Sequence, residues 1–304
     1  MTPSDSAAPA LEQHAQERTA RVSTRPFYWS VRRELWENRS VVLAPVLVAV
    51  LWMLGFAIST THLAERRRAL LVESVERQKA AIEQPYDVAA MAFLATALMV
   101  GFFYCLDALH GERRDRSILF WKSLPVSDLT AVLAKATIAT VVLPAISSLA
   151  TIATHLVMWT LGAIALREGG VEMPEGATVS LVRMESSLIY AHAVFALWYA
   201  PIFGWLLLLS AWARRATFLW AILPPLAASV LEKSAFDSSH LASLFAHRLF
   251  GHVKLAFAFD PEFRNGGDMT PGNFFGHAGL WLGLVFTAAC LAGAVRLRRQ
   301  GGPI

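Results

Sequence analysis

Charge is scarce in this sequence. Asp, Glu, Lys and Arg together make up 16% of the 304 residues, against about 25% in an ordinary soluble domain. Apolar residues make up 55%, and the mean hydropathy is +0.45. These apolar residues come in runs of roughly 20, the length that a helix needs to cross about 30 Å of hydrocarbon. The composition therefore predicts an all-α polytopic membrane protein.

Cysteine is also nearly absent. Cys105 and Cys290 both fall inside apolar runs, which excludes a disulfide framework and a Cys-x-x-Cys metal site. The sequence lacks the phosphate-binding loop G-x-x-x-x-G-K-[ST], the dinucleotide motif G-x-G-x-x-G after a strand, and the zinc motif H-E-x-x-H. We therefore expect no metal, cofactor or catalytic residue in this chain. If ATP drives its function, ATP and Mg must be bound by a partner chain.

Six membrane spans are predicted. Residues 1–24 lack apolar periodicity and are expected to be a mobile tail, followed by a single transmembrane domain over residues 25–304. The first apolar run follows a polar leader without a cleavage-site pattern, so it is not a signal peptide. The expected spans cover residues 41–60, 88–109, 129–166, 188–212, 216–231 and 278–295.

The positive charge is explained by membrane orientation. A net charge of +4 does not indicate nucleic-acid binding here, because Lys and Arg collect in the cytoplasmic loops of membrane proteins. Their distribution favours cytoplasmic termini, although Arg66, Arg67 and Arg68 in the first outer loop oppose this orientation. A seven-span alternative would place Arg214 and Arg215 outside.

The sequence also predicts the structure of segments between and within the spans. Residues 61–87 have the alternating charges of a solvated helix that ends at Pro85. Residues 129–166 exceed one straight span, and we expect one helix with Asp128 as N-cap and a kink at Pro144. Lys135 would then reach the cytoplasmic surface. Residues 232–277 are expected to form short interfacial or re-entrant outer helices.

A basic and aromatic stretch, Arg25–Ser40, precedes the first span. Tyr28, Val31 and Leu35 recur at helical spacing while the charges lie largely elsewhere, which is typical of an amphipathic helix in the membrane interface. The alternative is a basic lead-in that orients the first span, and both can hold. The residues assigned to this interfacial helix are Tyr28, Trp29, Arg32, Arg33, Glu34 and Trp36.

The segment HGERRDRSILFWKSLPVSD, residues 110–128, separates the second and third spans. Its charges of both signs suit polar docking, and its aromatic residues resemble the anchors that dominate protein interfaces. The candidate docking residues are Glu112, Arg113, Arg114, Asp115, Arg116, Phe120, Trp121, Leu124 and Pro125. The residues alone leave another interpretation open, in which the basic residues hold the loop inside while Phe120 and Trp121 sit among lipid headgroups.

This segment resembles a known family. GERRDRSILFWKSLPVSD, after FYCLDALH and before LTAVLAKA, resembles the cytoplasmic loop of the type-2 ABC transporter permeases, and VRRELWENRS before the first span fits the same family. The resemblance covers most of the chain, from Arg25 to Arg299, and is strongest over residues 107–135. It implies the membrane subunit of an ATP-driven exporter in a bacterial cytoplasmic (inner) membrane, catalytically silent alone, with a second permease copy and separate ATPase subunits as partners.

The resemblance also implies roles for particular segments. Residues 111–128 would carry a coupling helix that docks on the ATPase, and the Arg25–Arg39 helix would touch the ATPase side. Residues 232–277 would form the outer re-entrant region, and the first, second and fifth spans would line a pathway between two permease copies.

Ionisable residues inside the spans are few. Asp107, His155 and His192 lie near span ends, so no mid-membrane carboxylate is available for a proton-driven carrier.

Two other functions stay open. One is a non-transporting anchor that recruits a cytosolic partner or assembles an envelope machine. The other is an intramembrane enzyme, which requires a nucleophile and a base on facing spans.

Three histidines raise the question of a metal site. His247 and His252 are five residues apart, so they do not share a helical face as i, i+4 ligands do. No carboxylate completes a set with them or with His240. We expect these histidines to be interfacial residues, with an apolar ring body and a polar tip.

Overall fold

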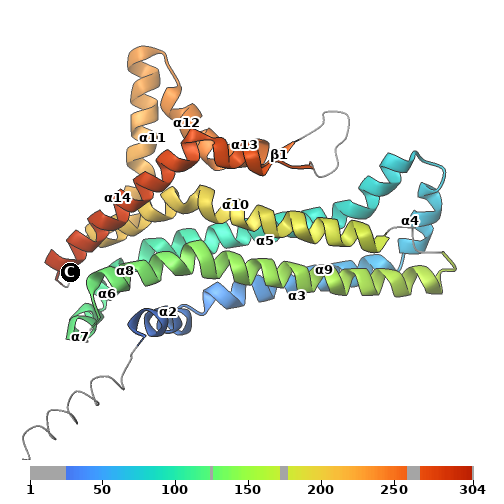
Figure 1. Cartoon of the computed structure of the whole chain (residues 1–304), viewed down its shortest axis with the longest axis horizontal. Coiled ribbons are helices and arrows are strands. Elements are labelled where there is room, and N and C mark those ends of the chain that lie inside the picture. The colour runs from blue at the N-terminus through green and yellow to red at the C-terminus, as the bar shows by residue number, and fades with distance from the viewer. Residues whose placement is uncertain (1–24, 124–125, 172–176, 259–267, 303–304) are drawn as a thin grey trace, which may run out of the picture.

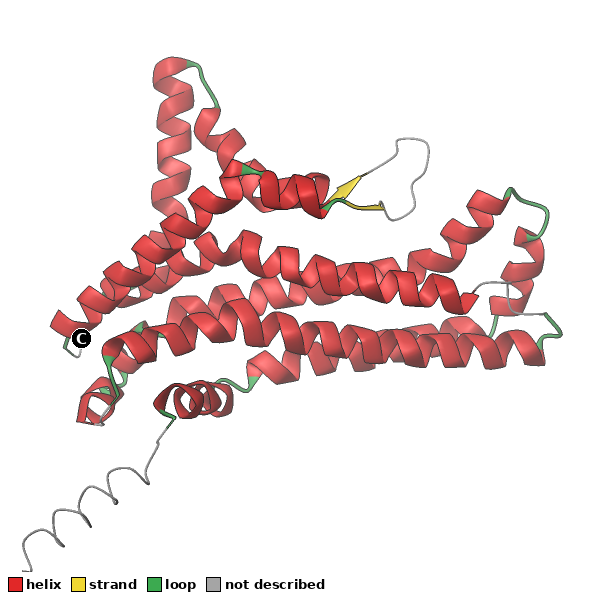
Figure 2. Cartoon of the chain, viewed as in Figure 1, coloured by secondary structure: helices red, strands yellow, loops and turns green. Residues whose placement is uncertain are grey.

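The chain is helical almost throughout (Figure 2). The structure is a computed structural model that describes residues 25–123, 126–171, 177–258 and 268–302. The predicted mobile tail, residues 1–24, lies outside the described residues. The helices are α2 Pro26–Glu37, α3 Ser40–Thr60, α4 Leu63–Leu70, α5 Val75–Asp107, α6 His110–Arg114, α7 Ser117–Ser123, α8 Asp128–Thr137, the π-helical turn η1 Ile138–Val142, α9 Leu143–Glu168, α10 Ala177–Trp212, α11 Thr217–Phe236, α12 His240–Ala256, α13 Pro271–Gly276 and α14 Ala278–Gln300. Among the described residues, β1 Phe257–Ala258 and β2 Asp268–Met269 form one antiparallel pair.

Five described helical stretches are long and apolar enough to cross a membrane. They are Ser40–Thr60, Arg77–Arg114, Asp128–Glu168, Leu181–Trp212 and Ala278–Gln300. These stretches contain five of the six predicted spans, so the architecture is that of a multi-pass α-helical membrane protein. The remaining predicted span, residues 216–231, forms α11, which is not among the five. Its apolar run is diluted by Pro224 and Pro225 inside the helix and by Glu232 and Lys233 near its end.

The second span begins much earlier than predicted. The expected helix end at Pro85 is wrong, because α5 continues through Pro85 without a break. An internal proline removes one helical hydrogen bond, which costs about 3 kcal/mol in an isolated helix. Here α5 packs along α3, α9 and α10, and tertiary packing of that kind overrides the local preference.

The third span is one continuous helical stretch, as predicted. Its N-cap is Ser127 rather than Asp128: the Ser127 hydroxyl accepts a hydrogen bond from the Thr130 amide at 3.1 Å. The expected kink position at Pro144 is preceded by η1, so the helix widens to π geometry just before the proline. Such a turn is a usual way to absorb an irregularity inside a helix.

Helix α10 forms the centre of the bundle. In its apolar stretch 67% of the residues are buried, against 11% for α3. It packs against α5, α9 and α14, and its Trp198, Phe203 and Leu207 side chains are fully buried. A Cβ at Gly204 would lie 3.3 Å from the Cα of Thr287, so the glycine allows α14 to approach α10 closely.

The long helices define two ends of the bundle. Figure 1 shows α3, α5, α9 and α10 running side by side, with α2, α6, α7 and the C-terminus gathered at one end. The α4 helix and the start of α5 lie at the opposite end. Helix α11 stands away from the long helices, whereas α12 packs against α10, and α14 returns across the bundle toward the C-terminal end. The predicted short helices of residues 232–277 are present as α12 and α13.

Candidate functional site

The segment between the second and third spans is fixed to the end of α10. It forms two short helices, α6 and α7, separated by Arg116 in the left-handed conformation with φ of 59°. The Ser210 hydroxyl accepts hydrogen bonds from the amides of Leu109 at 3.0 Å and His110 at 2.8 Å. Arg113 is buried and donates to the carbonyl of Ala211 at 2.6 Å, one of the last carbonyls of α10. A cation there also complements the negative end of the helix dipole.

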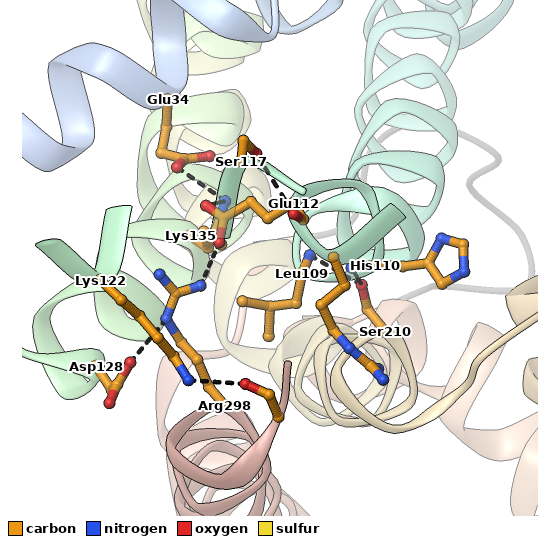
Figure 3. Close-up of polar contacts among 12 residues, drawn as sticks. Glu34, Leu109, His110, Glu112, Ser117, Lys122, Asp128, Lys135, Ser210 and Arg298 are labelled. Atoms are coloured by element: carbon orange, nitrogen blue, oxygen red, sulfur yellow. Dashed lines mark hydrogen bonds and ion pairs between the residues drawn. The ribbon is translucent and has the colours of Figure 1, made fainter. Parts of the chain in front are cut away.

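Glu112 lies inward, at the centre of a buried set of charges (Figure 3). Its Oε1 lies 3.1 Å from the ammonium of Lys135 on α8 and 3.4 Å from the guanidinium of Arg33 on α2. Its Oε2 accepts a hydrogen bond from Arg298 near the end of α14. Arg298 also donates through Nε to Asp128 at 3.1 Å. One carboxylate therefore joins α6 to three other helices.

Glu34 extends this set of charges toward α5. It is 1% exposed, and its Oε1 accepts a hydrogen bond from Lys135 at 2.8 Å. Its Oε2 accepts one from the Tyr104 hydroxyl at 3.1 Å. The expectation that Lys135 reaches the cytoplasmic surface is therefore wrong. Lys135 is 2% exposed, because two buried carboxylates provide a better partner than water at the end of a long side chain.

Apart from the exposed Glu37, which lies 3.6 Å from Arg33 at the edge, the charges in this network balance. It contains three carboxylates and three cations, which are Glu34, Glu112, Asp128, Arg33, Lys135 and Arg298. We refer to these six residues as the junction network. Burial opposes the charge on Arg33, but the nearby carboxylates of Glu34, Glu37 and Glu112 together outweigh it, so the pKa of Arg33 is raised. A balanced buried network adds little net stability, but breaking it leaves an uncompensated charge. Its effect is to hold α2, α6, α8 and α14 in one relative position.

The outer face of the segment is exposed among the described residues. Phe120 is 59% exposed, and Arg114, Asp115 and Arg116 are exposed beside it. The Phe120 and Trp121 rings meet edge to face at 4.8 Å. Of the predicted docking residues, Glu112 and Arg113 instead face the protein interior, and Leu124 and Pro125 lie outside the described residues.

Trp121 and Lys122 connect α7 to both terminal helices. The guanidinium of Arg33 lies over the Trp121 ring, 3.9 Å from its centroid. Lys122 donates to the carbonyl of Gly301 at 2.7 Å. The two short helices are therefore attached to α2, α10 and α14 while one face stays exposed.

Helix α2 lies with one side on the bundle and one side free. Ser30 and Glu34 are buried, while the predicted interfacial residues on the other side are exposed. These exposed residues are Tyr28, Trp29, Arg32 and Trp36. The Arg32 guanidinium lies over the Trp29 and Trp36 rings, 5.3 and 5.1 Å from their centroids. Arg33 and Glu34, which the sequence assigned to the same interfacial helix, belong to the junction network.

Several residues of this site carry no motif that predicts a role. Arg298, Tyr104 and Ser210 are polar and lie within or beside an apolar run. That signal is general, since isolated polar residues near span ends usually mark specific contacts. It does not identify partners, because the Arg298 and Glu112 positions are 186 residues apart.

Several histidines lie around one buried tryptophan ring. Among the described residues no group of three or more His, Cys, Asp or Glu side chains could hold a metal ion. His247 and His277 instead pack around the buried ring of Trp198. Burial, with the nearby Arg248 charge, lowers the pKa of His252 to about 4.

One contact bears on the enzyme alternative. His192 on α10 and the hydroxyl of Ser147 on α9 lie 3.3 Å apart, so a hydroxyl and a base do face each other across two spans. Both side chains are buried, and neither lines the cavity described below. Ser147 is also 3.3 Å from the Phe93 carbonyl on α5. This contact therefore joins three helices in the core.

The fold and this site define a class of protein: a multi-pass helical membrane protein in which a buried carboxylate of α6 is paired with cations of α8 and α14, while α7 contacts α2 and the residues after α14. Comparison with protein-family models, with curated proteins and with solved structures finds no match for this chain.

Proposed function

We propose that this chain is the membrane-spanning permease subunit of an ATP-binding cassette exporter, with a separate subunit that binds ATP and Mg. This proposal rests on the difference between the exposed face and the inner face of α6 and α7. Their exposed face offers Phe120 beside charges of both signs, and their inner face is attached to four other helices by the junction network and by Ser210. A segment built in this way can transmit the movement of a docked partner to the spans.

The docking surface is smaller than the sequence indicated. Arg114, Asp115, Arg116 and Phe120 form the exposed part, with Trp121 half-buried behind them. Apolar anchors in the centre of an interface contribute most of its binding energy, and surrounding charges set orientation and association rate. Glu112 and Arg113 act on the other side of the segment, where they connect it to the spans. The exposed aromatic residues of α2 extend the same end of the bundle toward the membrane interface.

A sixth crossing by α11 completes the proposed topology. Arg113 contacts the carbonyls of both Ala211, at the end of α10, and Gly302, after α14, at 2.6 and 3.4 Å. Helices α10 and α14 therefore end at the same side, so the chain between them must return to the other side before α14 can cross. The α11 helix has 20 residues, which is enough for one crossing. Both termini then lie on the cytoplasmic side of a bacterial inner membrane.

A second permease copy fits the exposed surface of α11 and α12. Leu223, Leu226 and Val230 on α11 are more than half exposed, as are Leu244 and Phe250 on α12. In a bilayer, lipid or another protein covers such residues. We propose that α11 faces the second copy and that the export pathway runs between the two copies.

The docking proposal is tested by a photo-crosslinker in place of Phe120. Membranes that express the chain are irradiated, and captured proteins are identified by mass spectrometry. We expect capture of an ATPase that contains the G-x-x-x-x-G-K-[ST] loop. The matched control carries the crosslinker in place of Phe103 on α5, which is 55% exposed but lies within a span.

Activity then separates a transporter from an anchor. We expect Phe120→Ala to reduce ATP hydrolysis by the purified complex at least tenfold, while Leu149→Ala, at a position that is 68% exposed on the third span, leaves it unchanged. A Phe120→Ala complex that retains its ATPase and full ATP-dependent export contradicts the proposal. A complex that binds the ATPase but moves no cargo in proteoliposomes identifies an anchor instead.

A further inference from the structure

A second feature lies at the opposite end of the bundle from α6 and α7. A cavity of about 720 Å³ opens there among α3, α4, α5, α9 and α10. Its volume falls within the range of roughly 300–1,000 Å³ that small-molecule sites occupy. The cavity is formed within one chain, so its occupancy does not depend on the proposed ATPase or on a second copy.

The cavity contains a buried cation without a partner. Arg67 on α4 lines it, is 9% exposed, and its Nη1 has no hydrogen-bond partner among the described residues. The indole Nε1 of Trp159 on α9, also in the lining, is buried and unpartnered. Burial lowers the pKa of the Arg67 guanidinium. A buried charge is costly unless it is paired, so this arrangement indicates that a ligand supplies the acceptor.

The other charges of the lining have mostly the same sign. Arg66, Lys79 and Arg183 accompany Arg67, and Glu83 is the acidic residue in the described lining. Arg183 lies 3.5 Å from Glu83, so part of this positive charge is already compensated. The remaining excess is positive. Guanidinium groups bind carboxylates and phosphates with two parallel hydrogen bonds, so an anionic group suits this site.

Most of the remaining lining is apolar. Phe56, Leu63 and Ile82 face the cavity with Leu166, Leu181 and Met184. These side chains offer no polar partner and favour an alkyl chain, because apolar surface removed from water contributes about 25 cal/mol per Å². A small inorganic anion would leave this part of the cavity without a complementary group.

We propose that this cavity binds a single-chain anionic amphiphile, with its carboxylate or phosphate on Arg67 and Trp159 and its alkyl chain among the apolar residues. The carboxylate of a fatty acid and the phosphate of a lysolipid share this chemistry. Both present a negative oxygen pair at the end of one apolar chain.

Binding is measured by native mass spectrometry on the full chain released from non-ionic detergent, with palmitate as the probe. We expect one palmitate per chain. Hexadecanol, which has the same chain length and no charge, should bind at least tenfold more weakly. Palmitoyl lysophosphatidate should displace palmitate, and inorganic phosphate at the same concentration should not.

Two variants test the two halves of the site. Arg67→Gln should weaken palmitate binding at least tenfold, while Arg77→Gln, at an exposed arginine outside the cavity, should leave it unchanged. Gly162 lines the cavity, and a Cβ there would meet its nearest neighbour, the Leu63 side chain, at 3.8 Å, an ordinary contact. Gly162→Leu should therefore reduce binding by filling the cavity, and Gly162→Ala should retain it.

A thermal unfolding measurement without palmitate shows whether a variant has lost binding because it is misfolded. Arg67→Gln should not lower the unfolding temperature, because it removes a buried charge that has no partner. The proposal is overturned if hexadecanol binds as tightly as palmitate, if phosphate alone displaces palmitate, or if Arg67→Gln and Arg77→Gln weaken binding equally. These outcomes say nothing about docking at Phe120, so the two proposals fail independently.

Discussion

Among single residues, Glu112 is the point where the junction network is most easily broken. Its two oxygens are shared among cations from α2, α8 and α14. Glu112→Gln removes the charge while keeping the shape, so Lys135 and Arg298 lose a shared buried counter-ion. We expect a loss of about 3 kcal/mol or more in the free energy of unfolding, measured by equilibrium unfolding in mixed detergent micelles.

The matched control is Arg114→Gln on the same short helix. Arg114 is exposed and pairs with Asp107 at 3.3 Å and Asp115 at 3.0 Å, so solvent screens both pairs and its removal should leave the free energy of unfolding nearly unchanged. A Glu112→Gln variant that unfolds like Arg114→Gln would show that solvent already compensates the network.

The sequence identified these charges but not their directions. Glu112, Arg113 and Arg114 are adjacent in one polar run, and all three were predicted to face a partner. Glu112 turns inward toward Lys135 and Arg298, and Arg113 turns inward toward the Ala211 carbonyl; these partners are far away in the sequence and come close only after the helices pack. Local sequence patterns show periodicity and polarity, and neither shows which distant residues come into contact.

At the scale of elements, apolar run length predicted most of the spans. Five of the six predicted spans coincide with helices that are long and apolar enough to cross a membrane, because this requirement is local and strong. The boundaries at prolines were predicted less well. Helix α5 begins at Val75, ahead of the expected start at residue 88, because packing supports the helix across Pro85. The expectation that a helix ends near a proline applies to isolated helices and does not take such packing into account.

In the hairpin of α11 and α12, a side chain of the first helix caps the start of the second, and no local sequence motif indicates this contact. The Glu232 carboxylate accepts hydrogen bonds from the amides of His240 at 2.8 Å and Leu241 at 2.7 Å, which caps the start of α12 from the end of α11. The Leu241 amide, then the Ser238 hydroxyl, lower the pKa of Glu232 below its ordinary value of 4.5. The cap is therefore complete above that value and is lost only as the pH falls through the lowered pKa.

Glu232→Ala should release the start of α12. We expect faster amide hydrogen exchange over residues 240–244 at neutral pH, because the first helical amides lose their acceptors. Lys233→Ala is the control, since Lys233 pairs with Asp237 in the same turn but caps no helix. Equal exchange in both variants would contradict a capping role for Glu232.

At the scale of the whole molecule, the positions of the helix ends constrain the topology more than hydropathy does. The end of α10, the end of α14 and the α6–α7 segment meet at one end of the bundle, where Arg113 and Lys122 contact them (Figure 1). Five crossings cannot place the ends of α10 and α14 on one side unless the chain between them also crosses. The proposed sixth crossing follows from this parity and not from the apolar content of α11.

Cysteine labelling tests directly whether the chain between α10 and α14 crosses the membrane. Asp115→Cys, Val72→Cys and Asp237→Cys place thiols at exposed positions on α6–α7, after α4 and after α11, while the native Cys105 and Cys290 are buried and should stay unlabelled. With a membrane-impermeant maleimide, Val72→Cys and Asp237→Cys should react in right-side-out vesicles and Asp115→Cys only in inverted ones. Labelling of Asp237→Cys from the same side as Asp115→Cys would mean that α11 does not cross. The pathway between two copies would then have to be built from the other five spans.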